Sequence, residues 1–365
     1  MLIAVITMAQ TIRACPLDTQ ADTTAHDSTT APQRKLGWFR RLVRGFDRLD
    51  ERYIEPQHYI FTVMLQSTHD FDYYTLRGRG PGALSATFSP DINFKIGPYV
   101  GWKWVFLGYT FDLRNLNLKD LKQQIDLSIY SSQIGIDVFY RRTGSDYKLR
   151  GVSFPDGRDD SRLKGLPFAG VKAGITGANV YYVFNHGRFS HPAAFAQSTV
   201  QKVSCGSWLM GIGYTQNSLD FDYTRLQATL AKEYPELEVP ADSGLMFRSV
   251  SYHDISVSAG YAYNWVFAHN WLMAVSLQGA LAYKKSSGDM TDVLQEGFSF
   301  ENVDFNGIGR FGLVYNNTRW YAGLSAIVRT YNYHESQFST NNTFGTINLY
   351  AGYNFGLKKK YRKKQ

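Results

Sequence analysis

Hydrophobic and polar positions alternate with a period of two residues along most of this chain. Between residues 254 and 263, Ile255 and Val257 begin an apolar face at the odd positions, while Asp254 and Ser256 begin a polar face at the even ones. Because successive side chains of a strand point to opposite faces, this period predicts β-strands with one apolar and one polar face. Four later segments alternate in the same way, namely 271–284, 302–316, 319–329 and 342–355.

Followed through the chain, the pattern predicts an all-β fold: an antiparallel transmembrane β-barrel of about twelve strands, an even number that lets both chain ends face the periplasm. Each segment is long enough for the about 9–11 residues with which a tilted strand crosses a bilayer. Ten or fourteen strands are the alternatives, because the turn at 131–133 has weak signals and the 186–203 connection is long. The expected strands are 58–67, 84–96, 99–112, 122–131, 133–142, 169–185, 204–222, 248–266, 270–285, 302–315, 318–333 and 342–356.

The lengths of the connections distinguish the two ends of the predicted barrel. Tight turns at Gly97-Pro98, at 268–270 and at 316–318 fall on one side. Outer-membrane barrels have short periplasmic turns and long external loops, so these turns are expected to face the periplasm. The longer connections on the other side are 143–168, 223–247 and 286–301.

Composition decides between a membrane barrel and a soluble β-sandwich, whose strands would also alternate. Aromatic residues make up 15% of the chain, there are 32 glycines, and only 19% of residues are charged, against roughly a quarter in soluble domains. No apolar run approaches the roughly 18 residues that predict a transmembrane helix. Two cysteines cannot form a disulfide scaffold. The composition therefore favours the membrane barrel.

The N-terminal region is predicted to precede the barrel in three parts. Residues 1–9 are typical of the end of a truncated signal segment, cleaved after Ala9, and residues 10–35 of a disordered linker. Cys15 offers a lipoprotein-like alternative, which Arg13 fits badly. Residues 36–55 combine apolar residues at helical spacing with four arginines on the opposite face. Such an amphipathic helix would either lie on an anionic lipid surface or cap the periplasmic mouth.

The barrel is expected over residues 56–357, followed by a basic tail at 358–365. This short tail contributes strongly to the formal net charge of +8. Its default interpretation is a solvated segment, and the sharper one is attraction to lipid headgroups or periplasmic polymers. Aromatic residues occupy strand faces instead of mixing with the basic residues, so the sequence does not predict nucleic-acid binding.

Eight strings in order resemble the uncharacterised family called domain of unknown function 4421, from Bacteroidetes-type bacteria. The similarity runs from about residue 47 to 356 and implies a signal-bearing envelope protein of Gram-negative bacteria. It implies no activity, substrate or catalytic residue. The strings are YIEPQHY (53–59), FKIGPYVGWKW (94–104), FLGYTFD (106–112), FYRRTGSDY (139–147), PAAFAQS (192–198), AYKKSSGD (282–289), GIGRFG (307–312) and QFSTNN (337–342).

Charged residues on the predicted lumen faces are the main candidate functional residues. Charges inside a barrel of this size either pair across strands and plug a narrow lumen or line a path for solutes. The plugging network is the preferred interpretation. Its expected members are Asp126, Asp137, Arg141, Asp254, Asp304, Arg310 and Arg329.

Catalytic chemistry has little support in the sequence. His334 and Ser336 share a strand face near the outer rim, where a histidine base could activate a serine hydroxyl of a lipid hydrolase. The simpler interpretation is a solvated external loop. The histidines have no metal-ligand spacing, no phosphate-binding glycine loop is present, and no cofactor is expected.

The sequence therefore predicts an outer-membrane β-barrel protein that is not an enzyme, located in the cell outer membrane. Its role would be envelope structure, binding or limited solute passage, with an outer-membrane lipid or lipopolysaccharide hydrolase as the alternative. The expected partners are outer-membrane lipid and the barrel-assembly machinery, without nucleic acid.

Overall fold

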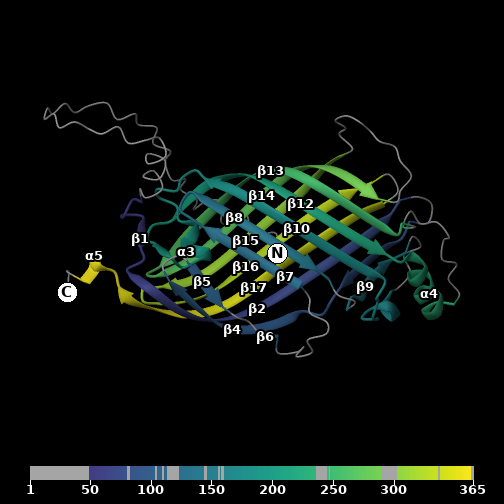
Figure 1. Cartoon of the computed structure of the whole chain (residues 1–365), viewed down its shortest axis with the longest axis horizontal. Helices are drawn as coiled ribbons and strands as arrows, with labels where there is room; N and C mark the ends of the chain where they lie inside the picture. Colours follow the sequence, from purple (N-terminus) through teal and green to yellow (C-terminus); the bar gives the residue numbers. More distant parts are fainter. Residues whose placement is uncertain are drawn as a thin grey trace.

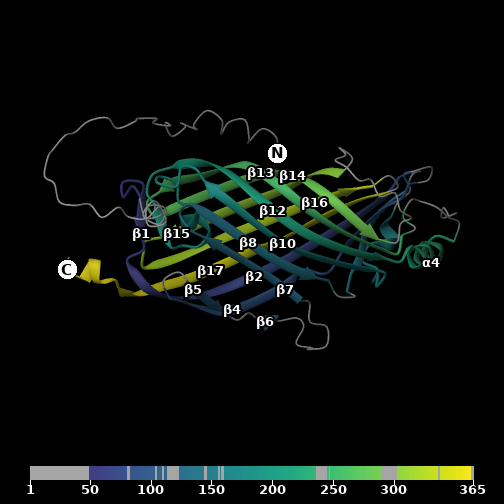
Figure 2. The same ribbon diagram turned by 45° about the horizontal axis from the view of Figure 1, so that its top comes forward.

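The computed structural model describes residues 49–79, 83–102, 105–108, 111–112, 123–143, 146–154, 157, 160–235, 245, 247–288, 302–335 and 338–362. Long antiparallel strands dominate these residues and roll into an elongated tube (Figures 1 and 2). The predicted segments 1–9 and 10–35, Cys15, and residues 36–48 of the predicted helix lie outside the described residues.

The main sheet contains β2 (Tyr59–Gly78), β3 (Ser85–Ser89), β4 (Asn93–Trp102), β5 (Val105–Gly108), β6 (Phe111–Asp112), β7 (Gln123–Tyr130), β8 (Ile134–Arg142), β9 (Lys148–Ser153), β10 (Val171–Val183), β12 (Cys205–Phe221), β13 (Ser249–Ala268), β14 (Trp271–Gly288), β15 (Val303–Asn316), β16 (Trp320–His334) and β17 (Phe338–Leu357). A separate pair joins β1 (Ile54–Pro56) to β11 (Thr199–Gln201). The helices are η3 (Ser161–Leu163), α3 (His191–Phe195), α4 (Tyr223–Glu233) and α5 (Lys359–Arg362). Among the described residues, no helix is long and apolar enough to span a membrane.

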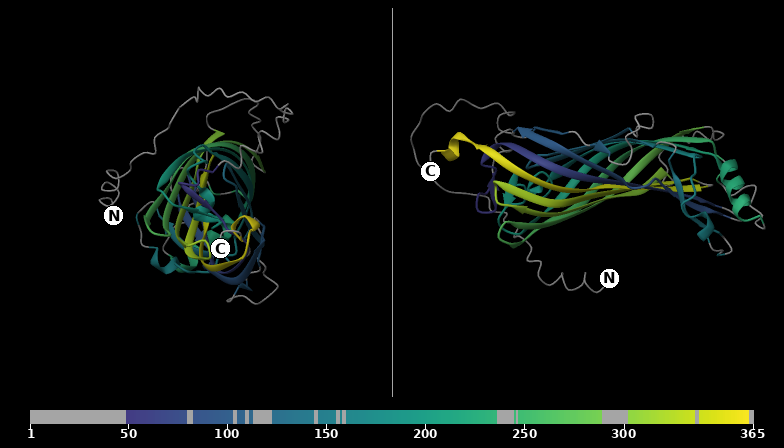
Figure 3. Two further views of the ribbon diagram at one scale, coloured as in Figure 1. Left: turned by 90° about the vertical axis from the view of Figure 1, so that its left-hand side faces the viewer. Right: turned by 90° about the horizontal axis from the view of Figure 1, so that it is seen from below.

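Neighbouring strands of the sheet pair antiparallel in the order β5-β4-β2-β17-β16-β15-β14-β13-β12-β10-β8-β7. The prediction of an all-β antiparallel fold is thus confirmed. Seen end-on, the sheet curls around a central axis (Figure 3). The described residues show no pairing between the edge strands β5 and β7. At the end that carries α4, β3 pairs with both β2 and β9, and Lys148 of β9 forms a bridge with Pro167 ahead of β10.

The predicted turn at Gly97-Pro98 is wrong, because both residues lie inside β4, paired with Gln66 and Leu65 of β2. On its other side, β4 pairs with β5 from Tyr99 onward and with β6 up to Ile96. Pro98 therefore falls between these two paired stretches, a place where a residue without an amide hydrogen is tolerated.

Other boundaries also differ from the sequence prediction. β2 continues eleven residues beyond the expected end at residue 67, to Gly78. The 143–168 connection contains β9. Within the predicted helix 36–55, residues 51–53 form a turn and Ile54 begins β1. The basic tail begins with the exposed helix α5. The turns at 268–270 and 316–318 are confirmed, and Asn270 and Thr318 adopt positive φ angles there.

The polarity of the tube reverses between its two ends. In the half nearer the tight turns, outward side chains are apolar, as in Ile212 and Leu277, which are 65% and 66% exposed, whereas Ser276 points inward and is fully buried. Toward α4, the outward residues of β12 become Ser218 and Asp220, and its inward residues become apolar. We call these parts the turn half and the loop half.

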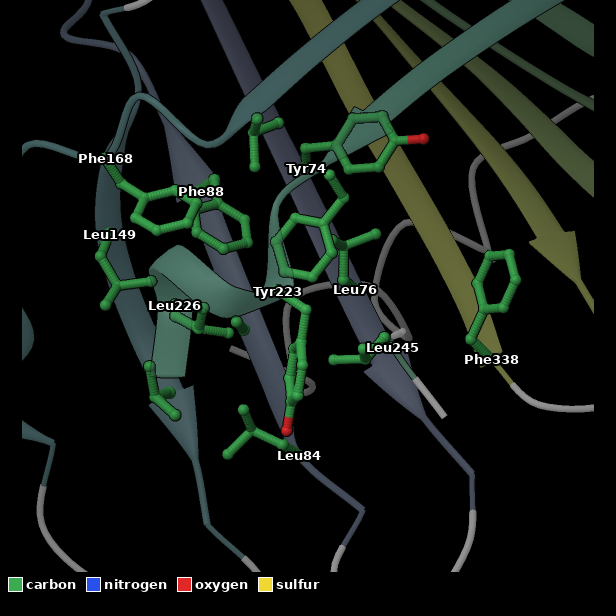
Figure 4. Close-up of a cluster of buried hydrophobic side chains, with 14 of the residues drawn as sticks. Tyr74, Leu76, Leu84, Phe88, Leu149, Phe168, Tyr223, Leu226, Leu245 and Phe338 are labelled. Carbon is green, nitrogen blue, oxygen red and sulfur yellow. The ribbon is translucent and has the colours of Figure 1, made fainter. Parts of the chain in front are cut away.

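A large apolar core fills the loop half. Inward residues from several strands pack with α4, and Figure 4 shows Phe88 and Phe168 beside Leu226 and Tyr223. The rings of Phe88 and Phe168 stack at 5.0 Å between centroids. The loop half is therefore organised like a soluble protein, with apolar residues inside, and the turn half has the opposite arrangement.

Candidate functional site: the charged lumen

A chain of ion pairs crosses the lumen in the turn half. Asp137 on β8 is fully buried and accepts a hydrogen bond from the Arg310 guanidinium on β15. Ser128 Oγ donates to the other oxygen of Asp137 at 2.6 Å, and Arg329 Nη2 on β16 lies 3.9 Å from that oxygen. Two opposite walls of the tube are thereby joined through side chains.

The ion pairs continue to the edge of the sheet. Asp126 on β7 receives Arg329 Nη1 at 3.1 Å and Arg141 Nη2 at 2.6 Å. Arg141 also lies 3.8 Å from Asp70 on β2, which pairs with Lys95 Nζ of β4 at 2.8 Å. These contacts connect β7 and β8 to β2 and β4, on the side where the described edge strands share no backbone pairing.

Aromatic rings cover the guanidinium groups of this network. Arg310 lies 4.9 Å from the ring centroid of Tyr181, and Arg329 lies 5.0 Å from that of Phe139. Arg141 lies 4.6 Å from the centroid of Phe344. The network thus holds four cations and three carboxylates, and cation–π contacts add to the ion pairing of its three arginines, which offsets the cost of removing these charges from water.

The structure brings together five of the seven predicted lumen residues: Asp126, Asp137, Arg141, Arg310 and Arg329. Asp254 lies elsewhere and accepts a hydrogen bond from Thr215. Asp304 pairs with Lys284 Nζ at 2.8 Å and with His334 Nδ1 at 2.6 Å. Sequence reasoning missed Asp70 and Lys95. Three even positions of β2 just before it, Thr62, Gln66 and Thr68, are polar, and this was the available signal for the inward direction of Asp70.

A short helix closes the lumen at the turn end. Helix α3 lies in the long 186–203 connection, and its first residues His191, Pro192, Ala193 and Ala194 are buried. Ser190 caps the helix by accepting from the Ala193 amide at 3.2 Å. A Cβ added at Gly312 of β15 would lie 3.3 Å from the Ala194 carbonyl oxygen, so the glycine permits this close approach.

Polar side chains attach this plug to the wall. Asn264 of β13 donates to the Ser190 carbonyl at 2.8 Å and to Gln201 Oε1 at 3.1 Å. Gln197 Nε2 donates to the Tyr350 hydroxyl at 2.7 Å. The lumen is thus occupied at three levels: α3 at the turn end, the ion network above it, and the apolar core in the loop half.

The hydrolase candidate is only partly within the described residues, because Ser336 lies outside them. His334 is at the end of β16, with a side chain 49% exposed. Its ring contacts the buried Asp304 carboxylate, which also holds Lys284. In the described part of the chain, no group of His, Cys, Asp and Glu side chains could hold a metal ion.

Comparison with solved structures gives broad but weak likenesses. The outer membrane protease OmpT from Escherichia coli is 8% identical, with a TM-score of 0.35, covering 81% of this chain and 97% of that one. OprG from Pseudomonas aeruginosa is 8% identical, with a TM-score of 0.23 and coverages of 82% and 98%. The toluene transporter TodX from P. putida is 7% identical, with a TM-score of 0.22 and coverages of 82% and 91%. At such TM-scores these likenesses assign neither an activity nor a location to this chain.

No curated protein matches the chain. The family model described as "Domain of unknown function (DUF4421)" matches residues 48–355, which include the whole sheet up to the last residues of β17. The resemblance seen in the sequence is confirmed, and the chain belongs to the DUF4421 family.

Proposed function

We propose that this protein is an outer-membrane β-barrel with a sealed interior, and that it acts in envelope structure and binding. The observation that carries the proposal is the polarity of the turn half, where apolar side chains face outward and a buried ionic network lies inside. Outward apolar residues on a closed surface are stable in lipid and costly in water.

Aromatic residues support a membrane boundary near the tight turns. Outward-facing rings pair between neighbouring strands there, with Trp271 and Tyr315 at 5.4 Å and Trp320 and Tyr353 at 4.5 Å between centroids. Aromatic girdles of this kind flank the apolar band of membrane barrels. With its 20 residues, β13 extends roughly 65 Å, or about 50 Å along an axis tilted by about 40°, against an apolar band of about 25 Å. The loop half would therefore project beyond the membrane.

The proposed barrel has twelve strands. The path of the main sheet names twelve strands. Its edges β5 and β7 are separated in the chain by the two-residue strand β6, which pairs with β4 beside β5, so pairing of β7 with this edge would complete the ring. Outer-membrane lipid and the barrel-assembly machinery are the proposed partners of such a protein. Turns at the periplasmic end and α4 outside the cell follow from the usual asymmetry of these barrels.

Three occupied levels of the lumen favour a sealed barrel over one that conducts solutes. In a planar bilayer, we expect the purified protein to add no steady conductance to the bare membrane. Heat-modifiable mobility on gels would show that the inserted protein is folded. Stable porin-like conductance would refute the sealed interior, and recovery of a soluble monomer without detergent would refute the membrane barrel itself.

A lipid hydrolase is the second candidate, favoured by the 2.6 Å contact between Asp304 and His334. A carboxylate that orients a histidine is part of serine-hydrolase chemistry. Lys284, however, already neutralises Asp304, so we expect no hydrolysis of phospholipid or lipopolysaccharide. Hydrolysis that disappears in both His334→Ala and Ser336→Ala, but persists in His253→Ala, would establish the enzyme instead.

A further inference from the structure

A groove of about 690 Å³ lies on the outer surface beside the junction of β3 and β4. Its lining residues are His69, Tyr73, Ser89, Pro90, Asp91, Ile92, Phe94 and Arg150. His69 and Phe94 are cross-strand partners on β2 and β4, and their rings meet edge to face at 4.8 Å. Tyr73 and Ile92 are 41% and 51% exposed, so the aromatic and apolar floor of the groove is open to the surroundings.

A register change between β3 and β4 creates this groove. Phe88 pairs with Tyr74 of β2, and the next pair joins Asn93 to Asp70. Four residues, 89–92, therefore lie opposite three residues, 71–73, of β2. An extra residue on one strand bends it and redirects its side chains, as in a β-bulge.

Two cations lie at this bulge, Arg150 in the lining of the groove and Lys148 beside it. Asp91 accepts Lys148 Nζ at 2.6 Å and Arg150 Nη2 at 2.8 Å, both from β9. Arg150 Nη2 also donates to the Pro90 carbonyl at 3.0 Å. The three charged groups leave one net positive charge beside the aromatic floor. Lys148 and Arg150 are each about one-third exposed, so their remaining donors can reach an external anion.

The groove lies where the outer surface changes from apolar to polar. On β2, the outward residues below it are Phe61, Val63 and Leu65, each at least 40% exposed. The outward residues above it are Thr75 and Arg77. In a membrane, acyl chains would cover the surface below this level and headgroups the surface above it. Because the loop half is proposed to project outside the cell, these headgroups would belong to the outer leaflet.

We propose that this groove binds a phosphorylated, multiply acylated glycolipid of the outer leaflet. Acyl chains would cover His69, Tyr73 and Phe94, and a phosphate would bind Lys148 and Arg150 through charge-assisted hydrogen bonds. The aromatic floor distinguishes such a lipid from free phosphate, which would leave that floor uncovered. The inference rests on the proposed membrane placement, because only a lipid-embedded barrel brings this surface to a headgroup layer.

The probe is bis-phosphorylated lipid A, added to the purified full-length protein in detergent micelles and followed by native mass spectrometry. Lys148→Ala/Arg150→Ala should weaken binding at least about tenfold, the effect of losing one or two charge-assisted bonds. Phe94→Ala should weaken binding of phosphorylated and dephosphorylated lipid A alike. Arg319→Ala is the matched control, because this exposed arginine lies over Tyr353 near the tight turns, at the opposite end of the tube from the groove.

Asp91→Asn separates ligand binding from structural support of the bulge. This change removes the carboxylate that competes for both cations, so we expect binding of lipid A to be retained or strengthened. Equal loss in Asp91→Asn and in the cation double variant would overturn the proposal. Equal loss in Arg319→Ala, or inorganic phosphate competing as well as lipid A, would also overturn it. Heat-modifiable mobility of each variant, measured in parallel, reports on the membrane barrel separately.

Discussion

The buried imidazole of His191 should make the α3 plug sensitive to acid. His191 is 1% exposed, and neither ring nitrogen has a hydrogen-bond partner among the described residues. Tyr130, Tyr181, Phe189 and Phe195 surround it, with the rings of Tyr130 and Phe195 at 5.0 Å and 4.8 Å. Burial, and then the positive charge of Arg310, lower the pKa of His191 from 6.5 to about 3, and Asp137 offsets this only in part.

The size of the effect follows from the difference in proton binding. We call α3 docked when it occupies the lumen and undocked when it has left it. An undocked α3 would place His191 in water with its ordinary pKa of 6.5, so the undocked state binds a proton at pH values where the docked state does not. The docked plug therefore keeps its full stability above pH 6.5 and loses about 1.4 kcal/mol for each pH unit below it. From pH 7.5 to pH 5.0 the loss is about 2 kcal/mol, which enlarges the undocked population roughly thirtyfold.

Thiol labelling measures this population directly. Ala193→Cys places a reporter on the buried side of α3, in a background where Cys15 and Cys205 are replaced. A water-soluble thiol reagent should label it faster, relative to a matched His191→Phe protein, as the pH falls. The ratio cancels the intrinsic pH dependence of the thiol. Phenylalanine fits the aromatic surroundings and removes two unpaired polar atoms, so its plug should be at least as stable at neutral pH.

A labelling ratio that stays constant from pH 7.5 to pH 5.0 would refute the reasoning. It would mean either that α3 does not undock or that His191 acquires a partner on protonation. Arg310 and Asp137 are the charged groups that act on the imidazole most strongly. Repeating the ratio in Asp137→Asn would distinguish the two causes, because a partner supplied by that carboxylate would be lost.

Two further predictions test the membrane placement and the ionic network. Leu277→Arg places a charge midway between the aromatic ends of β14 and should lower the free energy of unfolding in lipid vesicles by about 2–4 kcal/mol. Ser218→Arg, on the outward face of the loop half, should change this free energy little. Equal losses in the two variants would refute the assigned boundary. Asp137→Leu leaves the buried Arg310 without its main partner, so we expect the free energy of unfolding, measured by urea titration, to fall by about 3–5 kcal/mol. The double variant Asp137→Leu/Arg310→Met should recover most of that loss, because it leaves no unpaired charge at these two positions. A double variant no more stable than the single one would argue against pairing.

Whether a side chain points inward or outward could be predicted from the sequence, because a period of two residues separates the two faces of each strand. The prediction put Asp254 and Ile255 on opposite faces, and they are 4% and 66% exposed. The partners across the lumen could not be predicted, because they depend on how far each strand is staggered in the closed sheet. Arg310 and Asp137 are 173 residues apart and meet only through that stagger.

The extent of β2 was missed for a different physical reason. Its even positions point inward throughout, yet they change from Thr62 and Asp70 to Tyr74 and Leu76. A strand whose inward face turns from polar to apolar loses its regular hydrophobic alternation in the sequence, although its backbone continues unchanged. The same change of environment hid β9 and left α3 without a periodic signal, because a helix of five residues is too short to show one.

The reversal of polarity also explains why a costly ionic network fills one half of the lumen and an apolar core fills the other. Each strand keeps one polar face in both halves. This face points inward in the turn half, where lipid is the proposed surrounding, and outward in the loop half, where water is. An apolar lumen in the turn half would give strands that are hydrophobic on both faces, and such strands aggregate in water before assembly. Buried ion pairs are seldom more stabilising than well-packed apolar residues. For the proposed outer-membrane barrel, we therefore attribute the charged lumen to the need of the chain to stay soluble until its outward face meets lipid. The proposed sealed lumen leaves the outer surface, including the aromatic groove beside β3, as the place where this protein would bind a ligand.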